Sequence, residues 1–452
     1  MAATEPVTPS SEARAVAAPI ADWTDFRFDT RQVHVGEYPD ANRGARIPPL
    51  TLSAGYVFDS FDDGAARFSG DSREPIYSRQ GNPTNAVAEA RLASLEGGTA
   101  AVVVSSGQAA ITAALFALAE SGEHIVSTAS IYGGTRILFG RSFRRFGVEV
   151  DYVWDTDSDA AWDAVIRPTT KAIFTETIPN PRNDVVDIAR IKAVARRHGI
   201  PLVVDNTVAT PYLIRPFEHG ADIVVHSTTK FLSGHGAGVS GAVIDGGTFD
   251  WAGSTRSYPL LTDSLRPGSP SLLDRFGPAA YAQYVREAVV NDIGPSLSPF
   301  NGFLLHQGIE TLSLRMERHV DNAIAIAHWL EEQPEVQAVD YAGLASSPLR
   351  ELAQRYYGGR TGSVFAVTVT GGTQGARAFS NGLRIFSRMT GIGDTRSMVL
   401  HPLTTTHASF APDLNARLGI TAGMLRLSVG IESVDDLIAD LRDGLDRVAA
   451  VR

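Results

Sequence analysis

The chain has 452 residues, of which 44% are hydrophobic, so it is long enough to form two or three domains with apolar cores. Its 40 basic and 50 acidic residues give a formal net charge of −10, which argues against a nucleic-acid-binding surface. The sequence contains no cysteine, which excludes disulfides, thiolate metal sites and a cysteine nucleophile and makes a reducing compartment, the cytoplasm, the expected location.

The first half of the chain shows the alternation of a mostly parallel sheet covered by helices. Residues 1–25 are rich in Ala, Pro and Ser and lack the apolar core of a signal peptide, so we expect a disordered lead-in. Helices are expected at 107–121, which opens at a glycine, and at 188–199, which ends in basic residues and a glycine. The expected strands are 100–106, 124–128, 148–153, 170–177, 200–207 and 221–228.

The second half predicts a smaller α+β domain. Residues 298–333 have helical periodicity over a length that suits one long helix or two. Strands are expected within 363–370 and 424–430, and an amphipathic helix at 434–450 closes the chain. No apolar run is long enough to suggest a membrane span, because "SSGQ" interrupts the longest one.

Two stretches that follow predicted strands are candidate ligand-binding segments, since open α/β sheets bind ligands at the carboxyl ends of their strands. In "SSGQAA" a strand turns through Gly107 into a helix, whose free amides favour a phosphate group. An ordinary strand-to-helix turn is the alternative. Asp205 ends the apolar run "PLVVD", where it is either a ligand-binding carboxylate or a cap or turn aspartate.

Two basic residues occupy comparable places. Lys230 follows the hydroxyl residues Ser227, Thr228 and Thr229 and precedes three glycines in "HSTTKFLSGHGAG". Arg426 lies on the expected strand "LRLSVG", where a structural ion pair is the alternative to ligand binding. Taken together, the stretches meet the needs of pyridoxal 5′-phosphate, which requires a lysine for a Schiff base, an anion for its pyridinium nitrogen and a phosphate cradle of amides and hydroxyls.

Nine ordered motifs from about Thr30 to the C-terminus resemble those of the Cys/Met-metabolism family of pyridoxal-phosphate enzymes, and most closely its O-acetylhomoserine sulfhydrylases. They include "YSRQGNPTNAVAEARLASLEGG", "YGGT", "ETIPNP", "HGADIVVHSTTKF" and "LRLSVGIE". The resemblance implies an α/β protein of fold type I, similar to aspartate aminotransferase, with a large mostly parallel sheet domain and a smaller C-terminal α+β domain. It also implies a homo-oligomer, a dimer of subunits that share active sites and usually a tetramer. The implied divisions are an N-terminal arm at 26–75 that contributes to the neighbouring subunit, a cofactor domain at 76–305 and a C-terminal domain at 306–452.

The resemblance also implies roles for individual residues. Lys230 would form the Schiff base and later act as a base, and Asp205 would contact the pyridine nitrogen. Tyr132 would stack over the ring, with an acid–base role beside stacking left open. Arg426 would bind the substrate's α-carboxylate, helped by Ser397 and Tyr77. The remaining cofactor contacts implied are Ser106, Gly107, Gln108, Asn180, Thr207, Ser227 and Thr229, joined by Tyr77 and Arg79 from the neighbouring subunit.

The reaction implied is γ-replacement on O-acetyl-L-homoserine with sulfide or a thiol, giving L-homocysteine and acetate. A different carbon or thiol nucleophile stays open, because Leu403 and Thr404 in "HPLTTTH" depart from the family pattern near the expected substrate pocket. A succinyl ester and cystathionine γ-synthase or methionine γ-lyase activity are further alternatives. Gly134, where such lyases commonly carry cysteine, disfavours the last.

Two other readings are disfavoured by spacing. A nicotinamide-binding unit at 364–379 would need a G-x-G-x-x-G pattern, which that stretch lacks. The 11 histidines are scattered without metal-ligand spacing, so no metal is expected.

Overall fold

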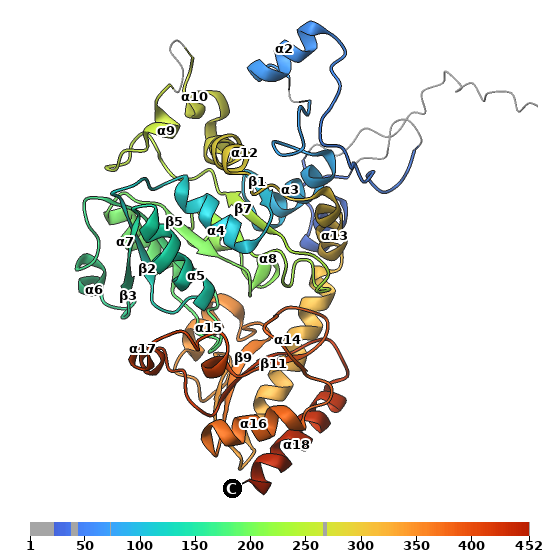
Figure 1. The fold of residues 1–452 in the computed structure, drawn as a ribbon, viewed down its shortest axis with the longest axis vertical. Coiled ribbons are helices and arrows are strands. Elements are labelled where there is room, and N and C mark those ends of the chain that lie inside the picture. Colours follow the sequence, from blue (N-terminus) through green and yellow to red (C-terminus); the bar gives the residue numbers. More distant parts are fainter. Residues whose placement is uncertain (1–21, 38–43, 73, 265–268, 452) are drawn as a thin grey trace, which may run out of the picture.

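The computed structural model describes residues 22–37, 44–72, 74–264 and 269–451. Most of the expected lead-in, residues 1–21, lies outside the described residues. No helix within the described ranges is both long enough and apolar enough to cross a membrane. In Figure 1 the large sheet and its helices form the upper part of the molecule, and a smaller sheet with its own helices forms the lower part.

The large sheet has the strand order β1-β7-β6-β5-β4-β2-β3. Its strands from β2 to β6 run parallel to their neighbours, whereas β7 is antiparallel to both β1 and β6, so the predicted mostly parallel sheet is confirmed. All six expected strands are present, with differences only at their ends. The bounds are β1 Ala100–Val104, β2 His124–Thr128, β3 Glu149–Val153, β4 Thr170–Glu176, β5 Leu202–Asp205, β6 Ile223–His226 and β7 Gly241–Asp245.

Helices cover both faces of the large sheet. Successive strand residues point to opposite sides, so both faces are apolar and each needs to be covered. Val204 packs in the core on one face and Val203 in the core on the other. The helices of this part are α3 Pro83–Glu96, α4 Gly107–Phe116, α5 Gly133–Ile137, α6 Asp159–Asp163, α7 Ile188–Arg197, α8 Thr210–Leu213, α9 Pro259–Thr262, α10 Leu272–Phe276, α11 Ala280–Tyr284 and α12 Asn291–Ile293. The expected helix at 107–121 ends earlier, at Phe116.

The expected long helix at 298–333 is two helices, α13 (Pro299–Ile309) and α14 (Leu312–Glu331), separated at Glu310 and Thr311. Helix α13 packs against α3 of the large part, whereas α14 contacts elements of the small part. Figure 1 shows α14 running from one part to the other. The two sheets are therefore connected through the length of one helix.

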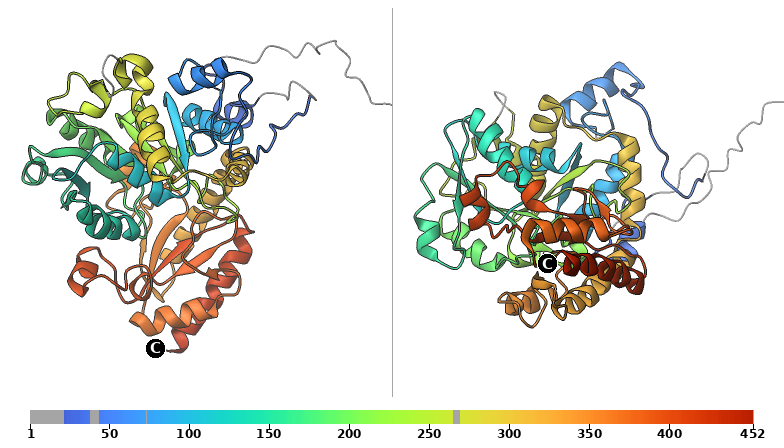
Figure 2. Two further views of the ribbon diagram at one scale, coloured as in Figure 1. Left: turned by 45° about the horizontal axis from the view of Figure 1, so that its top comes forward. Right: turned by 60° about the horizontal axis from the view of Figure 1, so that its bottom comes forward.

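The small sheet has the order β10-β11-β12-β9-β8 and is antiparallel except between β10 and β11. Helices α16 and α18 lie side by side against it (Figure 2). The predicted closing helix is confirmed at its expected bounds, 434–450. The elements are β8 Val336–Asp340, α15 Arg350–Tyr357, β9 Val364–Val369, α16 Gly372–Gly382, β10 Ser387–Arg388, β11 Met398–Leu400, α17 Pro412–Arg417, β12 Met424–Ser428 and α18 Val434–Ala450.

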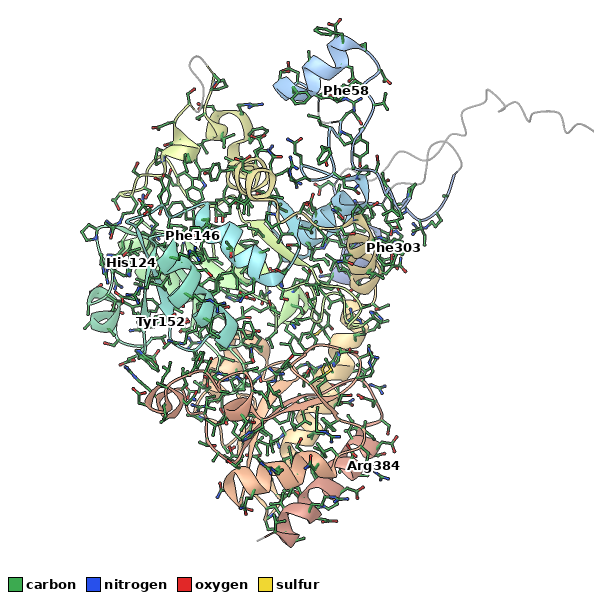
Figure 3. The ribbon with its side chains drawn as sticks, viewed as in Figure 1. Phe58, His124, Phe146, Tyr152, Phe303 and Arg384 are labelled. Atoms are coloured by element: carbon green, nitrogen blue, oxygen red, sulfur yellow. The ribbon has the colours of Figure 1, made fainter. Side chains whose placement is uncertain are left out.

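Two N-terminal helices behave differently. Helix α1 (Phe28–His34) packs against α3, and its buried Gln32 donates from Nε2 to Ser313 Oγ at 2.8 Å. Helix α2 (Phe61–Ser69) projects from the large part, together with the labelled Phe58 (Figures 1 and 3). Helix α1 is thus held by the rest of the chain, whereas α2 exposes the large apolar side chains of Phe61 and Phe68.

An ion-pair network centred on the buried Arg91 fixes the chain just after α1. Arg91 is fully buried and donates from Nη2 to Glu37 Oε1 at 3.0 Å, and His306 Nε2 lies 2.7 Å from the same oxygen. Glu310 and Arg46 complete the network. Ligand-type atoms of Glu37, His306 and Glu310 lie within 4.8 Å of one another, but the two guanidinium groups already supply the opposing charge.

This network predicts a stability difference that depends on pH. Burial alone would raise the pKa of Glu37, but hydrogen bonds from His306, Arg46 and Arg91 lower it to about 2. The carboxylate therefore stabilises the fold fully above its ordinary pKa of 4.5, and this contribution is lost as the pH falls towards 2. We expect Glu37→Gln to lower the free energy of unfolding by about 3–5 kcal/mol at pH 7, because Arg91 loses its buried partner.

Urea unfolding of both proteins between pH 7 and pH 3 measures this difference, which should narrow as the medium becomes more acidic. Glu149→Gln is the matched control, since Glu149 pairs with Arg167 at the surface and its loss should matter little. A gap between wild type and Glu37→Gln that stays constant over the whole range would contradict the assignment.

Candidate active site

The ends of β1, β5 and β6 bring the predicted residues to one edge of the large sheet, because these strands run in the same direction. The chain turns into α4 at Gly107 after β1, and Lys230 lies four residues beyond the end of β6. Gly107 approaches Ser227 so closely that a Cβ placed on the glycine would lie 2.5 Å from Ser227 Cβ. Glycine is therefore required where the two segments meet.

The N-terminus of α4 forms an anion-binding corner. Ser106 caps the helix by accepting a hydrogen bond at Oγ from Ala109 N at 3.1 Å. The amides of Gly107 and Gln108 belong to the first turn and have no partner within the helix ladder. With Ser227 beside them and the positive end of the helix dipole behind them, these groups fit a phosphate.

Lys230 differs from the other two lysines of the chain. Lys171 pairs with Glu123 and Lys192 with Asp222, whereas Lys230 Nζ has no hydrogen-bond or ion-pair partner among the described residues. Burial, helped by the charge of Arg426, lowers the pKa of Lys230. A lysine in this environment is more readily neutral, which both covalent attachment to a carbonyl group and proton abstraction require.

Asp205 lies buried at the end of β5. Thr207 donates to Asp205 Oδ1 from its backbone N at 2.9 Å and from its hydroxyl group, and Thr207 Oγ1 accepts from Ser227 N at 2.8 Å. Burial raises the pKa of Asp205, against the two Thr207 hydrogen bonds and the charge of His226. A buried carboxylate of this kind fits a cationic partner such as a protonated pyridine nitrogen.

Arg426 reaches this edge from β12 of the small part. Its Nη1 lies 3.3 Å from Asn180 Oδ1, and its Nη2 donates to the carbonyl oxygens of Thr390 and Gly391 at 2.9 Å each. Burial lowers the pKa of Arg426 to about 10. Within the described part of the chain its Nε has no partner and no carboxylate pairs with it, so the guanidinium group fits an incoming carboxylate.

Tyr132 stands at the start of α5, half exposed, with its backbone N donating to Glu176 Oε1 at 2.7 Å. Its ring lies over Gly134, where an added Cβ would be 2.4 Å from Tyr132 Cε1. Any side chain at position 134 would therefore displace the ring.

Four predicted residues contact parts of the described chain other than the Lys230 side chain. Tyr77 pairs with Gly55, and Arg79 donates from Nε to Asn291 Oδ1 at 3.3 Å. Thr229 donates its hydroxyl proton to Ser240 O at 3.0 Å, and the Ser397 hydroxyl group bonds to Glu432 and Gly430. The ligand contacts assigned to these four residues, like those assigned to the other site residues, stay predictions.

The loop "HPLTTTH" meets the site through residues other than those singled out from sequence. Leu403 packs with Ile420 and Met424, and Thr404 is exposed. Thr406 O and His407 Nε2 instead lie next to Gly133, at 3.5 and 3.7 Å from the position of a Cβ built there. The loop therefore approaches the Tyr132 segment through its last two residues.

Helix α14 connects the lysine loop to the segment after Arg426. Arg315, in its first turns, donates to Phe231 O and Gly308 O at 2.6 Å each. His319 Nδ1 bonds to Val429 O at 2.7 Å, and Asn322 Nδ2 donates to Gly430 O at 3.0 Å. One helix thus holds the backbone on both sides of the site.

Glu176 is the residue at this edge that the sequence reasoning missed. It ends β4 as Asp205 ends β5, and the two are paired in register. A signal is present in the sequence, because Glu176 lies two residues after the apolar stretch "AIF", whereas Asp205 directly follows "PLVV".

A lysine, a buried carboxylate and a helix N-terminus at one edge of such a sheet fit a fold type I pyridoxal-phosphate enzyme. The family model for Cys/Met metabolism PLP-dependent enzymes matches residues 29–446. The chain therefore belongs to this family, and its cofactor is pyridoxal phosphate.

Known proteins are similar in sequence or structure to this chain over nearly its whole length. O-acetyl-L-homoserine sulfhydrylase of Corynebacterium glutamicum is 44% identical over 92% of this chain and 96% of its own, and homocysteine synthase of Schizosaccharomyces pombe is 41% identical over 93% and 98%. A crystal structure of an O-acetylhomoserine (thiol)-lyase from Campylobacter jejuni, which carries a pyridoxyl-lysine monophosphate, matches with a TM-score of 0.89 and 34% identity over 93% of this chain and all of that one.

Proposed function

We propose that the enzyme replaces the γ-acetoxy group of O-acetyl-L-homoserine with sulfide or a thiol, giving L-homocysteine and acetate. The observation that carries this choice within the family is the end-to-end similarity to sulfhydrylases and to a homocysteine synthase. The site agrees with an amino-acid substrate, because among the described residues no carboxylate pairs with the buried Arg426 and Lys230 Nζ has no partner, and both side chains belong to the same edge of the large sheet.

The cofactor, when bound, supplies an electron sink that makes the α- and β-protons of the amino acid acidic. Lys230 Nζ accepts the α-proton and later returns it, a role that its lowered pKa supports. Asp205 holds the proton on the ring nitrogen, and Arg426 binds the α-carboxylate in a bidentate manner. Gly107, Gln108 and Ser227 hold the phosphate. In the overall exchange acetate leaves with the electron pair of the γ-carbon–oxygen bond, and the sulfur donates the pair of the new carbon–sulfur bond.

The proposal includes an oligomer in which residues 26–75 contact a neighbouring subunit. The projecting α2 segment supports it, because large apolar side chains there are exposed although burial is their usual state. Tyr77 and Arg79 would then complete the phosphate site of the neighbour. The exposed apolar residues of this segment are Leu52, Val57, Phe58, Phe61 and Phe68.

The test is homocysteine formation by the purified enzyme from O-acetylhomoserine and sulfide, with O-succinylhomoserine and methionine as parallel substrates. We expect turnover to be fastest with the acetyl ester. Acetate release without efficient homocysteine formation would overturn sulfide as the nucleophile, and preference for the succinyl ester or for methionine would overturn the substrate.

A further inference from the structure

Glu176 and Asp205 form a pair of buried carboxyl groups at the end of two neighbouring strands. They are opposite each other in the parallel pairing of β4 with β5, and the two residues are only 5% and 9% exposed. Residues paired in this way point to the same face of a sheet, with strands about 4.8 Å apart. Two negative charges on neighbouring residues that are buried away from water repel each other strongly, so the pair retains a proton.

The hydrogen bonds decide which member keeps the negative charge. Asp205 accepts two hydrogen bonds from Thr207 and lies in the field of His226, which is itself paired with Glu96 at 2.5 Å. Glu176 accepts one, from Tyr132 N. Burial, followed by the charge of Asp205, raises the pKa of Glu176 well above its ordinary value. The ionised form is therefore better stabilised on Asp205.

A protonated Glu176 can still hold Tyr132. One oxygen of a carboxylic acid carries the proton, and the other remains a carbonyl acceptor for an N–H donor. The acceptor at 2.7 Å from Tyr132 N fixes the backbone at the first residue of the "YGGT" turn, on which the orientation of the tyrosine ring depends.

We propose that Glu176 is a positioning residue, a neutral carboxylic acid whose carbonyl oxygen holds the backbone of Tyr132 and whose proton leaves the single negative charge of the pair on Asp205. The proposal rests on the roles proposed above for Tyr132 and Asp205.

Two variants separate the two properties of Glu176. Glu176→Gln keeps the shape, the neutral charge and the acceptor oxygen, so kcat and KM should stay within about threefold of wild type. Glu176→Leu keeps the bulk and removes the acceptor, so kcat/KM should fall about 10–100-fold through misplacement of Tyr132. A folded Glu176→Gln enzyme that loses as much activity as Glu176→Leu would overturn the proposal.

Infrared difference spectra of the holoenzymes give a readout independent of activity. Subtracting Glu176→Gln from wild type at neutral pH should reveal the carbonyl stretch of a protonated carboxylic acid. Loss of ionised-carboxylate bands instead would overturn the proposal, even if Glu176→Leu fails to fold. Glu149→Gln, at an exposed ion pair, shows what loss of an ionised carboxylate looks like. The infrared result does not depend on the ester or nucleophile, so a failed homocysteine assay with the acid band present would reject the proposed function alone.

Discussion

Replacing Lys230 with alanine is expected to reduce turnover by more than about 10³-fold, because the change removes both the covalent attachment point and the base. The other site groups, including Asp205 and Arg426, stay in place, so binding of the cofactor without a covalent bond should persist. Turnover and the visible absorption of the bound cofactor are the measurements. Borohydride reduction followed by peptide mass mapping locates the attachment directly, since the chain offers only three lysines.

Lys192→Arg is the matched control for this experiment. Lys192 of α7 pairs with Asp222, which directly precedes β6, and arginine can keep that ion pair. The control should retain activity and absorption. A covalent label on Lys171 or Lys192 in the wild-type enzyme, or a Lys230→Ala protein that keeps full turnover, would remove Lys230 from its assigned role.

The second large effect is expected at Arg426. Arg426→Met should lower kcat/KM about 10²–10³-fold, mainly through a higher KM, because the substrate's carboxylate loses a buried charged partner. Arg426→Lys should recover only part of this loss, since an ammonium group cannot make two parallel hydrogen bonds to a carboxylate.

Steady-state kinetics with varied O-acetylhomoserine measure the effect, and Arg384→Met is the control. Arg384 is exposed on the small part and pairs with Asp443 at the surface (Figure 3). An unchanged KM for Arg426→Met, with the whole loss in kcat, would show that this residue does not bind the ground-state substrate.

The sequence predicts the central elements of the fold well, because buried parallel strands are continuous apolar runs and the helices between them are amphipathic. It misses β7, which follows a glycine-rich stretch and reads as part of a loop. It also leaves the break between α13 and α14 open, since Glu310 and Thr311 interrupt no periodic pattern.

The position of a candidate residue was predictable where that residue ends a strand or forms a motif, as with Asp205 and Lys230. Contacts between distant positions were not. Asn180 and Arg426 touch although 246 positions separate them, and the pairing of Glu176 with Asp205 depends on the order of strands in the sheet. Spacing along the chain carries no record of either.

Helix α14 fixes the spacing between two segments of the proposed site. Arg315 donates a hydrogen bond to the carbonyl oxygen of Phe231, next to Lys230. Asn322, seven positions after Arg315 in the same helix, donates to the carbonyl oxygen of Gly430, beyond Arg426. An α-helix rises 1.5 Å per residue, so these two residues are about 10 Å apart along the helix axis. Backbone contacts outside the site therefore help to set the distance between Lys230 and Arg426, the residues proposed to move the α-proton and to bind the carboxylate. A one-residue insertion in α14 between Arg315 and Asn322 would change the position of Lys230 relative to Arg426. It would do so without altering any residue of the proposed site.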